Sequence, residues 1–302
     1  EGALDDLAHH KTIRASDWDG RVITTHRPDA VVDPDYEGFA DNVRTFGDLT
    51  GQDTHSWKGY LEAHRIRRAF FIEEGGATAT DHGHPTAMTA DLSKAEAETL
   101  FGRVLGGDLR PGDAELFRGQ MLTEMARMSM DDGLTMQIHA GASRNHNRPV
   151  FERFGRDKGA DVPSETEYVE ALKPLLGAVG NERDLTIILF TLDEDVSSRE
   201  LAPLAGHYPA LLLGPPWWFH DSPEGMRRFR ERTTETAGFY NTAGFNDDTR
   251  AFLSIPSRHD VARRMDAVWL AQLVAEHRMD EHEARELMPD LANGLARKAY
   301  KL

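Results

Sequence analysis

The segment of residues 244–250 (Gly-Phe-Asn-Asp-Asp-Thr-Arg) carries two adjacent carboxylates and an arginine two residues further on. It follows a short apolar and aromatic run, so these residues are expected where a strand ends. Residues two apart in a strand share a face, which would let Asp248 and Arg250 point into one cavity. A carboxylate can bind a metal or move a proton, and an arginine can hold a carboxylate or an oxyanion. The alternative is a loop in which Asp247 and its neighbours cap the next helix and Arg250 makes a surface ion pair.

Two other segments offer imidazole groups. His139 follows an apolar run, shares a strand face with Gln137, and precedes small residues that leave room for a ligand. It could bind a ligand or carry a proton, or it could be a hydrogen-bonded structural residue. His82 and His84 have the His-x-His spacing that can place two imidazoles on one metal ion. They stand beside a glycine and a proline, so the alternative is a turn in which both rings bond to the backbone.

Aromatic and cationic side chains could bind a substrate. Trp217 and Trp218 follow another apolar run and could form the wall of a sugar-sized pocket, where a ring stacks and an indole N–H donates a hydrogen bond. They could equally belong to the core or to a dimer contact. Arg27 precedes a proline, which favours an extended backbone, and could bind a substrate carboxylate. An ion pair with the acidic surface is the alternative for Arg27.

Six strand candidates alternate with helices along the chain, and the residues above follow five of them. The candidates are residues 21–25, 77–80, 134–138, 185–190, 209–213 and a stretch within 238–248. Continuous alternation predicts a parallel sheet with right-handed crossovers, either doubly wound and open or closed as a (β/α)8 barrel. No candidate is followed by Gly-x-Gly-x-x-Gly or a P-loop, so no nucleotide cofactor is expected. Polar residues at the strand ends favour the barrel. The polar stretch 145–163 is predicted to be a loop.

Composition limits the partners and the metal ligands. The chain has 302 residues and a net charge of −16 at pH 7, which disfavours nucleic acid and anionic membranes as partners. It has no cysteine, so a metal must use His, Asp or Glu. The chain starts with Glu rather than Met and has two strand candidates fewer than a closed barrel. We therefore expect residues 1–302 to be one domain, the larger C-terminal part of a barrel whose first strands precede residue 1.

Five blocks of the sequence resemble, in the same order, motifs of the uronate (glucuronate) isomerase family. Residues 214–226 are similar to the family pattern Gly-Pro-x-Trp-Trp-Phe-x-Asp-Ser…Gly-Met, and residues 244–254 resemble Gly-Met-x-Thr-Asp-Ser-Arg-Ser-Phe-Leu-Ser. Three shorter blocks, residues 25–29, 81–83 and 137–142, extend the resemblance over nearly the whole chain. Asp247 and Thr249 stand where the family has Thr and Ser, whereas Asp248 and Arg250 are kept.

The resemblance implies a (β/α)8 TIM barrel of the amidohydrolase superfamily, with about six of its eight units in this chain and with the first strands and a helical insertion before residue 1. It implies aldose–ketose isomerisation, which interconverts D-glucuronate with D-fructuronate and D-galacturonate with D-tagaturonate. It also implies a divalent metal, zinc or manganese, held by Asp248 and by a His-x-His that would lie before residue 1. His82 and His84 are then expected not to bind that metal. A cytoplasmic homo-oligomer that binds a small hexuronate completes the expectation.

Such an isomerisation moves a proton between C2 and C1 of the open-chain sugar. It requires a base, a group that stabilises the enediolate oxygen, and a clamp for the C6 carboxylate. We expect Asp248 as base and metal ligand, Arg250 or the metal at the developing oxyanion, and His139 as hydrogen-bond partner or proton shuttle. Arg27 would hold the substrate carboxylate and Trp217 would line the pocket. Two alternatives stay open: a metal-dependent hydrolase of the same superfamily acting on a lactone or amide, and a non-catalytic barrel that binds sugars.

Overall fold

A computed structural model describes residues 1–156, 158–217, 220–248 and 251–302. The chain divides into two compact units. The first unit comprises Glu1–Ile138 and Glu170–Ile187, and the second comprises His139–Val169 and Ile188–Leu302. Within the described ranges, no helix is both long and apolar enough to cross a membrane.

Four strands form the main sheet, in the order β1-β2-β5-β6. Their bounds are β1 (Ala79–His82), β2 (Thr135–Ala140), β5 (Ile187–Thr191) and β6 (Leu211–Leu213). Strand β1 pairs with β2 in parallel, with Thr80 opposite Met136. Residues 187–190 are at most 2% exposed, as the continuous apolar run of β5 predicts. The predicted α/β alternation with a parallel sheet is thereby confirmed.

The first strand candidate, residues 21–25, is not a strand. The two residues that follow make isolated parallel bridges, His26 with Thr80 and Arg27 with Gly2. The backbone N–H of Thr24 instead donates to the carbonyl of Gly75 at 3.1 Å. Strand β1 begins only at Ala79 and does not extend beside residues 21–25, so these residues do not join the sheet.

The last strand candidate, within residues 238–248, is also reduced to a bridge. Thr242 pairs with Leu213 of β6, and the N–H of Ala243 donates to the carbonyl of Leu213 at 2.8 Å. Gly244 then adopts a φ of 69°, which takes the backbone out of the extended conformation. The pairing therefore stops before the acidic residues that follow.

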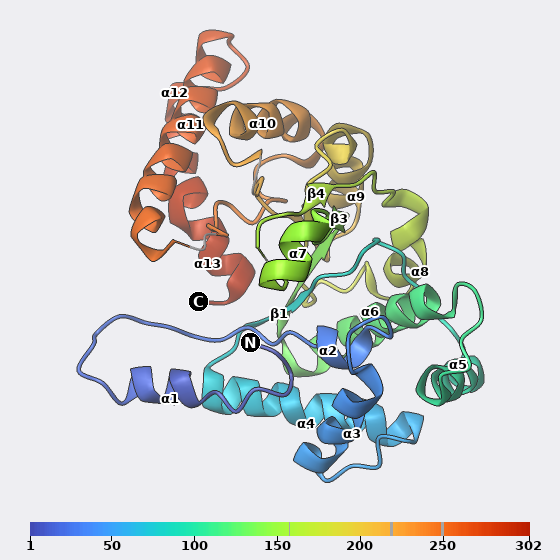
Figure 1. Cartoon of the computed structure of the whole chain (residues 1–302). Coiled ribbons are helices and arrows are strands. Elements are labelled where there is room, and N and C mark those ends of the chain that lie inside the picture. Colours follow the sequence, from blue (N-terminus) through green and yellow to red (C-terminus); the bar gives the residue numbers. More distant parts are fainter. Residues whose placement is uncertain (157, 218–219, 249–250) are drawn as a thin grey trace. The chain divides into compact units, whose positions relative to one another are not determined.

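The helices of the first unit enclose an aromatic core. They are α1 (Ala8–Arg14), α2 (Asp29–Val32), α3 (Phe39–Thr50), α4 (Trp57–Gly75), α5 (Lys94–Gly106), α6 (Asp113–Asp132) and, from its second residue on, α8 (Val169–Val179). Helix α3 packs against α4, and α5 against α6 (Figure 1). Tyr60 of α4 stacks on Phe101 of α5, with ring centroids 4.6 Å apart, and its hydroxyl donates to the carbonyl of Val31 at 2.6 Å. Ser93 and Glu96 form a capping box at the start of α5.

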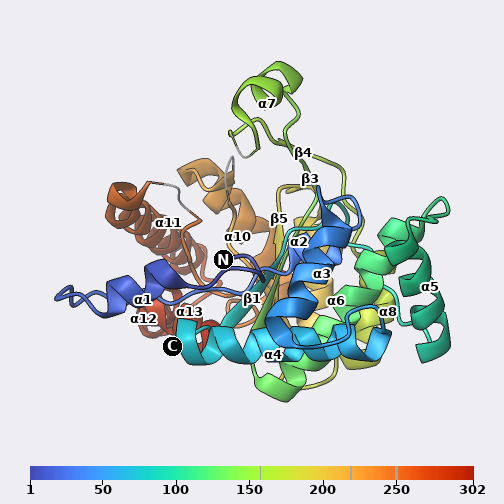
Figure 2. The same cartoon turned by 60° about the horizontal axis from the view of Figure 1, so that its bottom comes forward.

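The second unit contains the remaining helices and a small strand pair. Its elements besides the sheet strands are β3 (Ala142–Ser143), α7 (Arg148–Phe154), β4 (Val162–Pro163), η1 (Ser197–Leu201), α9 (Ala202–His207), α10 (Pro223–Ala237), η3 (Phe252–Ser254), α11 (Ile255–Ala275), α12 (Glu281–Pro289), η4 (Asp290–Gly294) and α13 (Leu295–Tyr300). Helix α10 packs against both α9 and α11. Strands β3 and β4 are antiparallel, with α7 carried at the far end of this pair (Figure 2).

The prediction of a loop over residues 145–163 was wrong, because these residues contain α7 and β4. The side chain of Asn147 caps α7 by accepting the N–H of Val150 at 3.3 Å, and a proline follows in the first turn. From the sequence alone this asparagine and proline are not recognised as the start of a helix, because the residues around them are polar as in a loop. Before β3, Gly141 adopts a φ of 84°, and a Cβ at this position would lie 2.0 Å from the hydroxyl of Thr166.

Candidate active site

His139 and Trp217, two of the predicted site residues, lie together in the second unit. The His139 ring stacks on Phe190 of β5, with centroids 4.2 Å apart and planes at 10°, and contacts Trp217 at 4.8 Å. Trp217 is 4% exposed and packs with Ile188, Phe190 and Leu192. Two aromatic contacts thus fix the orientation of the imidazole. Trp217 serves the core, which was the alternative for it, and its role as a pocket wall stays a prediction.

The two adjacent acids have different environments. Asp248 is exposed, whereas the side chain of Asp247 is only 2% exposed. Asp247 forms an ion pair with Arg258 of α11, which also pairs with Asp221. The expectation that Asp248 stands at a strand end was wrong, because the pairing ends before Gly244. Two predicted site residues lie outside the described part of the chain: Arg250 and Trp218.

Arg27 belongs to the first unit and lies among carboxylates. Its Nε is 3.1 Å from Asp81 and 3.6 Å from Asp29, while 46% of its side chain is exposed. Asp29 also accepts the backbone N–H of Gly83 at 3.0 Å, which ties this ion-pair group to the end of β1. An ion pair was the alternative for Arg27. The structure shows this ion pair, and the binding of a substrate carboxylate stays a prediction.

Four histidines of the first unit are fully buried. His26, His64, His82 and His84 are at most 4% exposed, and burial is the first cause that lowers the pKa of each. Repulsion from Arg68 acts in the same direction on His64, whose pKa is lowered to about 3. All four rings are therefore neutral near pH 7.

The His-x-His pair does not form part of a metal site in the described structure. The rings of His82 and His84 are 6.2 Å apart between centroids and nearly perpendicular, and Nε2 of His82 lies 3.0 Å from the hydroxyl of Thr80. No group of three or more His, Asp or Glu side chains that could hold a metal occurs within the described ranges. Asp248 has no companion ligands there, so these residues do not by themselves fit the divalent metal that the resemblance implies.

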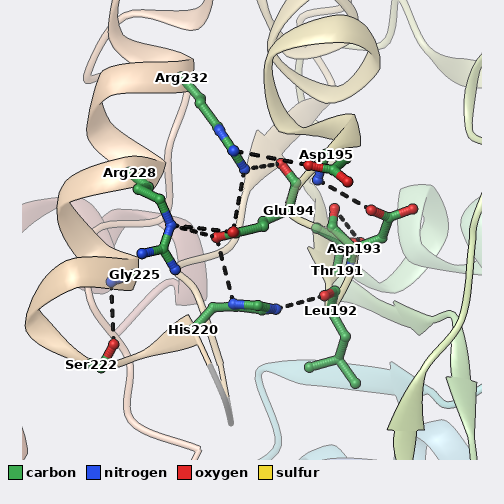
Figure 3. A network of polar contacts seen from close by, with 10 residues as sticks. All are labelled: Thr191, Leu192, Asp193, Glu194, Asp195, His220, Ser222, Gly225, Arg228 and Arg232. Atoms are coloured by element: carbon green, nitrogen blue, oxygen red, sulfur yellow. Dashed lines mark hydrogen bonds and ion pairs between the residues drawn. The ribbon is translucent and has the colours of Figure 1, made fainter.

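Sequence reasoning missed a network around Glu194, which follows β5. Its carboxylate accepts from Nε of Arg228 at 3.1 and 3.2 Å, and its carbonyl accepts from Arg232 at 2.7 Å (Figure 3). His220 reaches the same carboxylate with Nδ1 at 3.5 Å, while its Nε2 donates to the carbonyl of Leu192 at 2.8 Å. The network thereby joins the segment after β6 to the segment after β5. Glu194 lies three residues after Thr191, the last residue of β5, and this position shortly after a strand was the signal that the sequence offered.

A pocket of the second unit adjoins this network, and Glu194 belongs to both. Its empty space, open solvent included, is about 390 Å3, and Leu189, Leu213 and Glu194 are among its lining residues. Leu189 alternates along β5 with Phe190, which contacts His139, so the two side chains leave opposite faces. The pocket is therefore distinct from the place where His139 and Trp217 meet.

Comparison with known proteins places the chain in a family. The family model described as glucuronate isomerase matches residues 1–299. A uronate isomerase of Phenylobacterium zucineum is 68% identical over 302 residues, which are all of this chain and 63% of that protein. A uronate isomerase of Mesorhizobium japonicum is also 68% identical, over 64% of its length. The chain therefore spans somewhat less than two thirds of these relatives.

Solved structures agree with this match. The crystal structure of glucuronate isomerase from Caulobacter crescentus has 65% sequence identity and a TM-score of 0.96, over all of this chain and 63% of its own. Uronate isomerase from Thermotoga maritima has 25% identity and a TM-score of 0.92, over 99% of this chain and 66% of its own. The match runs through the segments that carry His139, Trp217 and Asp248. The chain belongs to the glucuronate isomerase family.

Proposed function

We propose that the protein to which this chain belongs interconverts aldose and ketose forms of hexuronates, D-glucuronate with D-fructuronate and D-galacturonate with D-tagaturonate. The observation that carries the proposal is the family match over residues 1–299, together with relatives of 68% identity that are uronate isomerases. The hydrolase alternative has no comparable support, because none of these relatives is a hydrolase. A small hexuronate is the substrate in this proposal.

The roles of the residues follow from what proton transfer between C2 and C1 requires. Asp248 is proposed as the base, since its carboxylate is exposed and able to meet a substrate. Arg250 is proposed to stabilise the enediolate oxygen. His139, whose ring is fixed by Phe190 and Trp217, is proposed to hydrogen-bond a sugar hydroxyl or to carry the proton. A fixed ring supports this role because the hydrogen bond needs no reorientation of the imidazole.

A divalent metal and a closed barrel also belong to the proposal. Asp248 would be one ligand of zinc or manganese, and the described residues do not complete a ligand set, so no step is assigned to the metal. A (β/α)8 barrel is supported by the strand order β1-β2-β5-β6, which follows the chain, and by the bridges at His26 and Thr242 on the outer strands. A homo-oligomer in the cytoplasm is part of the same proposal, and light scattering would measure the mass of the assembly.

Full-length protein supplied with Zn²⁺ or Mn²⁺ and glucuronate in D2O tests the proposal. NMR should show a new ketose signal, and deuterium at C2 of recovered glucuronate would report proton exchange with solvent. Galacturonate in a parallel sample measures the preference between the two uronates. Binding of glucuronate without turnover would favour the non-catalytic sugar-binding barrel, and hydrolysis of lactones in its place would favour the hydrolase.

Replacing Arg27 by alanine in the full-length protein is expected to raise KM for glucuronate by about 10- to 100-fold, the effect of losing a hydrogen-bonded charge pair. KM for the corresponding neutral aldose should change much less, because that sugar lacks the C6 carboxylate. Steady-state kinetics with both sugars measures the difference. Arg44→Ala is the control, since Arg44 is an exposed arginine of the same unit that pairs with Asp41. Equal increases for both sugars would contradict the carboxylate clamp.

A further inference from the structure

Arg258 of α11 contacts two carboxylates that come from different segments of the second unit. Its Nε donates to Asp247 and its Nη2 donates to Asp221. The side chain of Arg258 is 30% exposed, that of Asp221 10%, and that of Asp247 2%. Burial lowers the pKa of Arg258, but the hydrogen bonds to Asp247 and Asp221 outweigh it and raise the pKa above its usual value. The guanidinium is therefore a permanent cation between the two segments.

Each of these segments carries a residue proposed for the active site. Asp247 directly precedes Asp248, the proposed base. Asp221 stands in the segment after β6 that begins beside Trp217 and continues into α10, which Ser222 caps. The neighbouring His220 already ties this segment to the carbonyl of Leu192 and to Glu194 (Figure 3). Arg258 of α11 adds a further contact to this segment, and the same arginine also pairs with Asp247.

Asp247 depends on this cation because its side chain is almost entirely out of water. Its Oδ2 has no hydrogen-bond partner among the described residues, so the ion pair with Arg258 is the contact that compensates its charge. A buried carboxylate without a cation is strongly unfavourable. On the apolar side, Phe245 of the same segment packs against Met226 and Ala262. Without Arg258, Asp247 would be driven toward water, and Asp248 would move with it because the two are adjacent.

We propose that Arg258 is a positioning residue of the active site, one side chain that holds both the segment of Trp217 and the segment of Asp248 through Asp221 and Asp247. Neither acid is in itself proposed to touch the substrate. The inference rests on the proposed function for its effect on turnover, but the order of the two segments can be measured without substrate. A failure of the isomerase assignment is therefore distinguishable from a failure of this inference.

Hydrogen–deuterium exchange of the full-length protein tests the positioning, with the amides of Gly214, Trp217 and residues 220–222 as the first segment and those of residues 244–248 as the second. Arg258→Gln should speed exchange in both segments by about tenfold or more, which corresponds to losing hydrogen bonds to a charged group. Asp221→Asn should speed exchange mainly in the first segment, and Asp247→Asn mainly in the second. Arg258→Lys should restore slow exchange in only one of them, because an ammonium lacks the fork that reaches two carboxylates. Arg264→Gln is the control on α11, since Arg264 is exposed and pairs with Asp260 on the same helix.

Kinetics separates positioning from general stability. Asp247→Asn should lower kcat by about tenfold or more with little change in KM, because it disturbs the base. Asp221→Asn should act mainly on KM, because it disturbs the segment of Trp217. If Arg258→Gln fails to fold, the two asparagine variants still decide the matter. The inference would be overturned if every variant changed the exchange rate equally in both segments. It would also be overturned if kcat fell to the same extent in every variant while the exchange rates stayed unchanged.

Discussion

Asp248→Asn in the full-length protein is expected to lower kcat for glucuronate isomerisation by at least about 100-fold, the usual contribution of a positioned proton-transfer group. Asparagine keeps the shape of the side chain but cannot accept the proton from C2 and is a weaker metal ligand. Because Asp248 is exposed and forms no ion pair with a buried cation among the described residues, the folded structure should tolerate the change. Steady-state kinetics and the incorporation of deuterium at C2 measure the effect.

A matched control for Asp248→Asn is Asp195→Asn. Asp195 follows β5 in the same unit, and its side chain is 87% exposed. This control should keep kcat and KM close to those of the unchanged protein. Full activity of Asp248→Asn, with the control equally active, would remove Asp248 from the mechanism and would turn attention to the second acid, Asp247.

A strong loss of stability in mild acid is the second expected result. His26, His64, His82 and His84 are buried and neutral, and in the unfolded chain each takes up a proton near pH 6.5. Below that pH the unfolded state binds more protons than the folded state, so the free energy of unfolding falls as the pH falls. Above pH 6.5 both states are neutral and these residues add no pH dependence. For His64 the loss continues down to its folded-state pKa of about 3.

The expected slope is about 1.4 kcal/mol per pH unit for each histidine, hence on the order of 5 kcal/mol per unit while all four remain neutral in the folded state. Urea unfolding of the full-length protein at pH 7, 6 and 5 measures it. His64→Leu should reduce the slope by about 1.4 kcal/mol per pH unit, the contribution of one proton. The fold should tolerate this change, because neither ring nitrogen of His64 has a hydrogen-bond partner among the described residues. His282→Gln, at a side chain 79% exposed, should leave the slope unchanged. Identical slopes for the protein and His64→Leu would contradict a buried neutral His64.

Features that depend on sequence neighbours could be predicted. A continuous apolar run identified β5. The three-residue spacing of Ser93 and Glu96 is typical of the capping box that α5 has, and Gly133, with a φ of 77°, ends α6 as glycine commonly does. Such patterns are visible because the interacting groups lie within one or two turns of each other. The family motifs could be recognised in the same way, because each of them is a contiguous stretch of the sequence.

Features that depend on distant partners could not be predicted. Arg68 stands in an Arg- and His-rich helix whose pattern suggests a solvated face, yet it is fully buried because Asp132 and Ser129 of another helix accept its hydrogen bonds. The resemblance marked Asp247 only as a departure. Nothing local identified Arg258 as its partner, since that arginine reaches it from the following helix. Pairings across the fold are fixed by packing, and they leave no period in the sequence.

The turn at Gly141 sets a limit on how this protein can be diversified. Its φ of 84° and the 2.0 Å that would separate a Cβ from the Thr166 hydroxyl exclude side chains there. His139 lies two positions before this turn. The chain must therefore keep the turn at Gly141 if β3 is to follow while the imidazole of His139 stays in contact with Phe190 and Trp217. A combinatorial library that randomises residues 139–143 should therefore return folded members with glycine at the third position whatever residue selection favours at the first. Engineering of a new substrate preference at His139 would start from four variable positions rather than five.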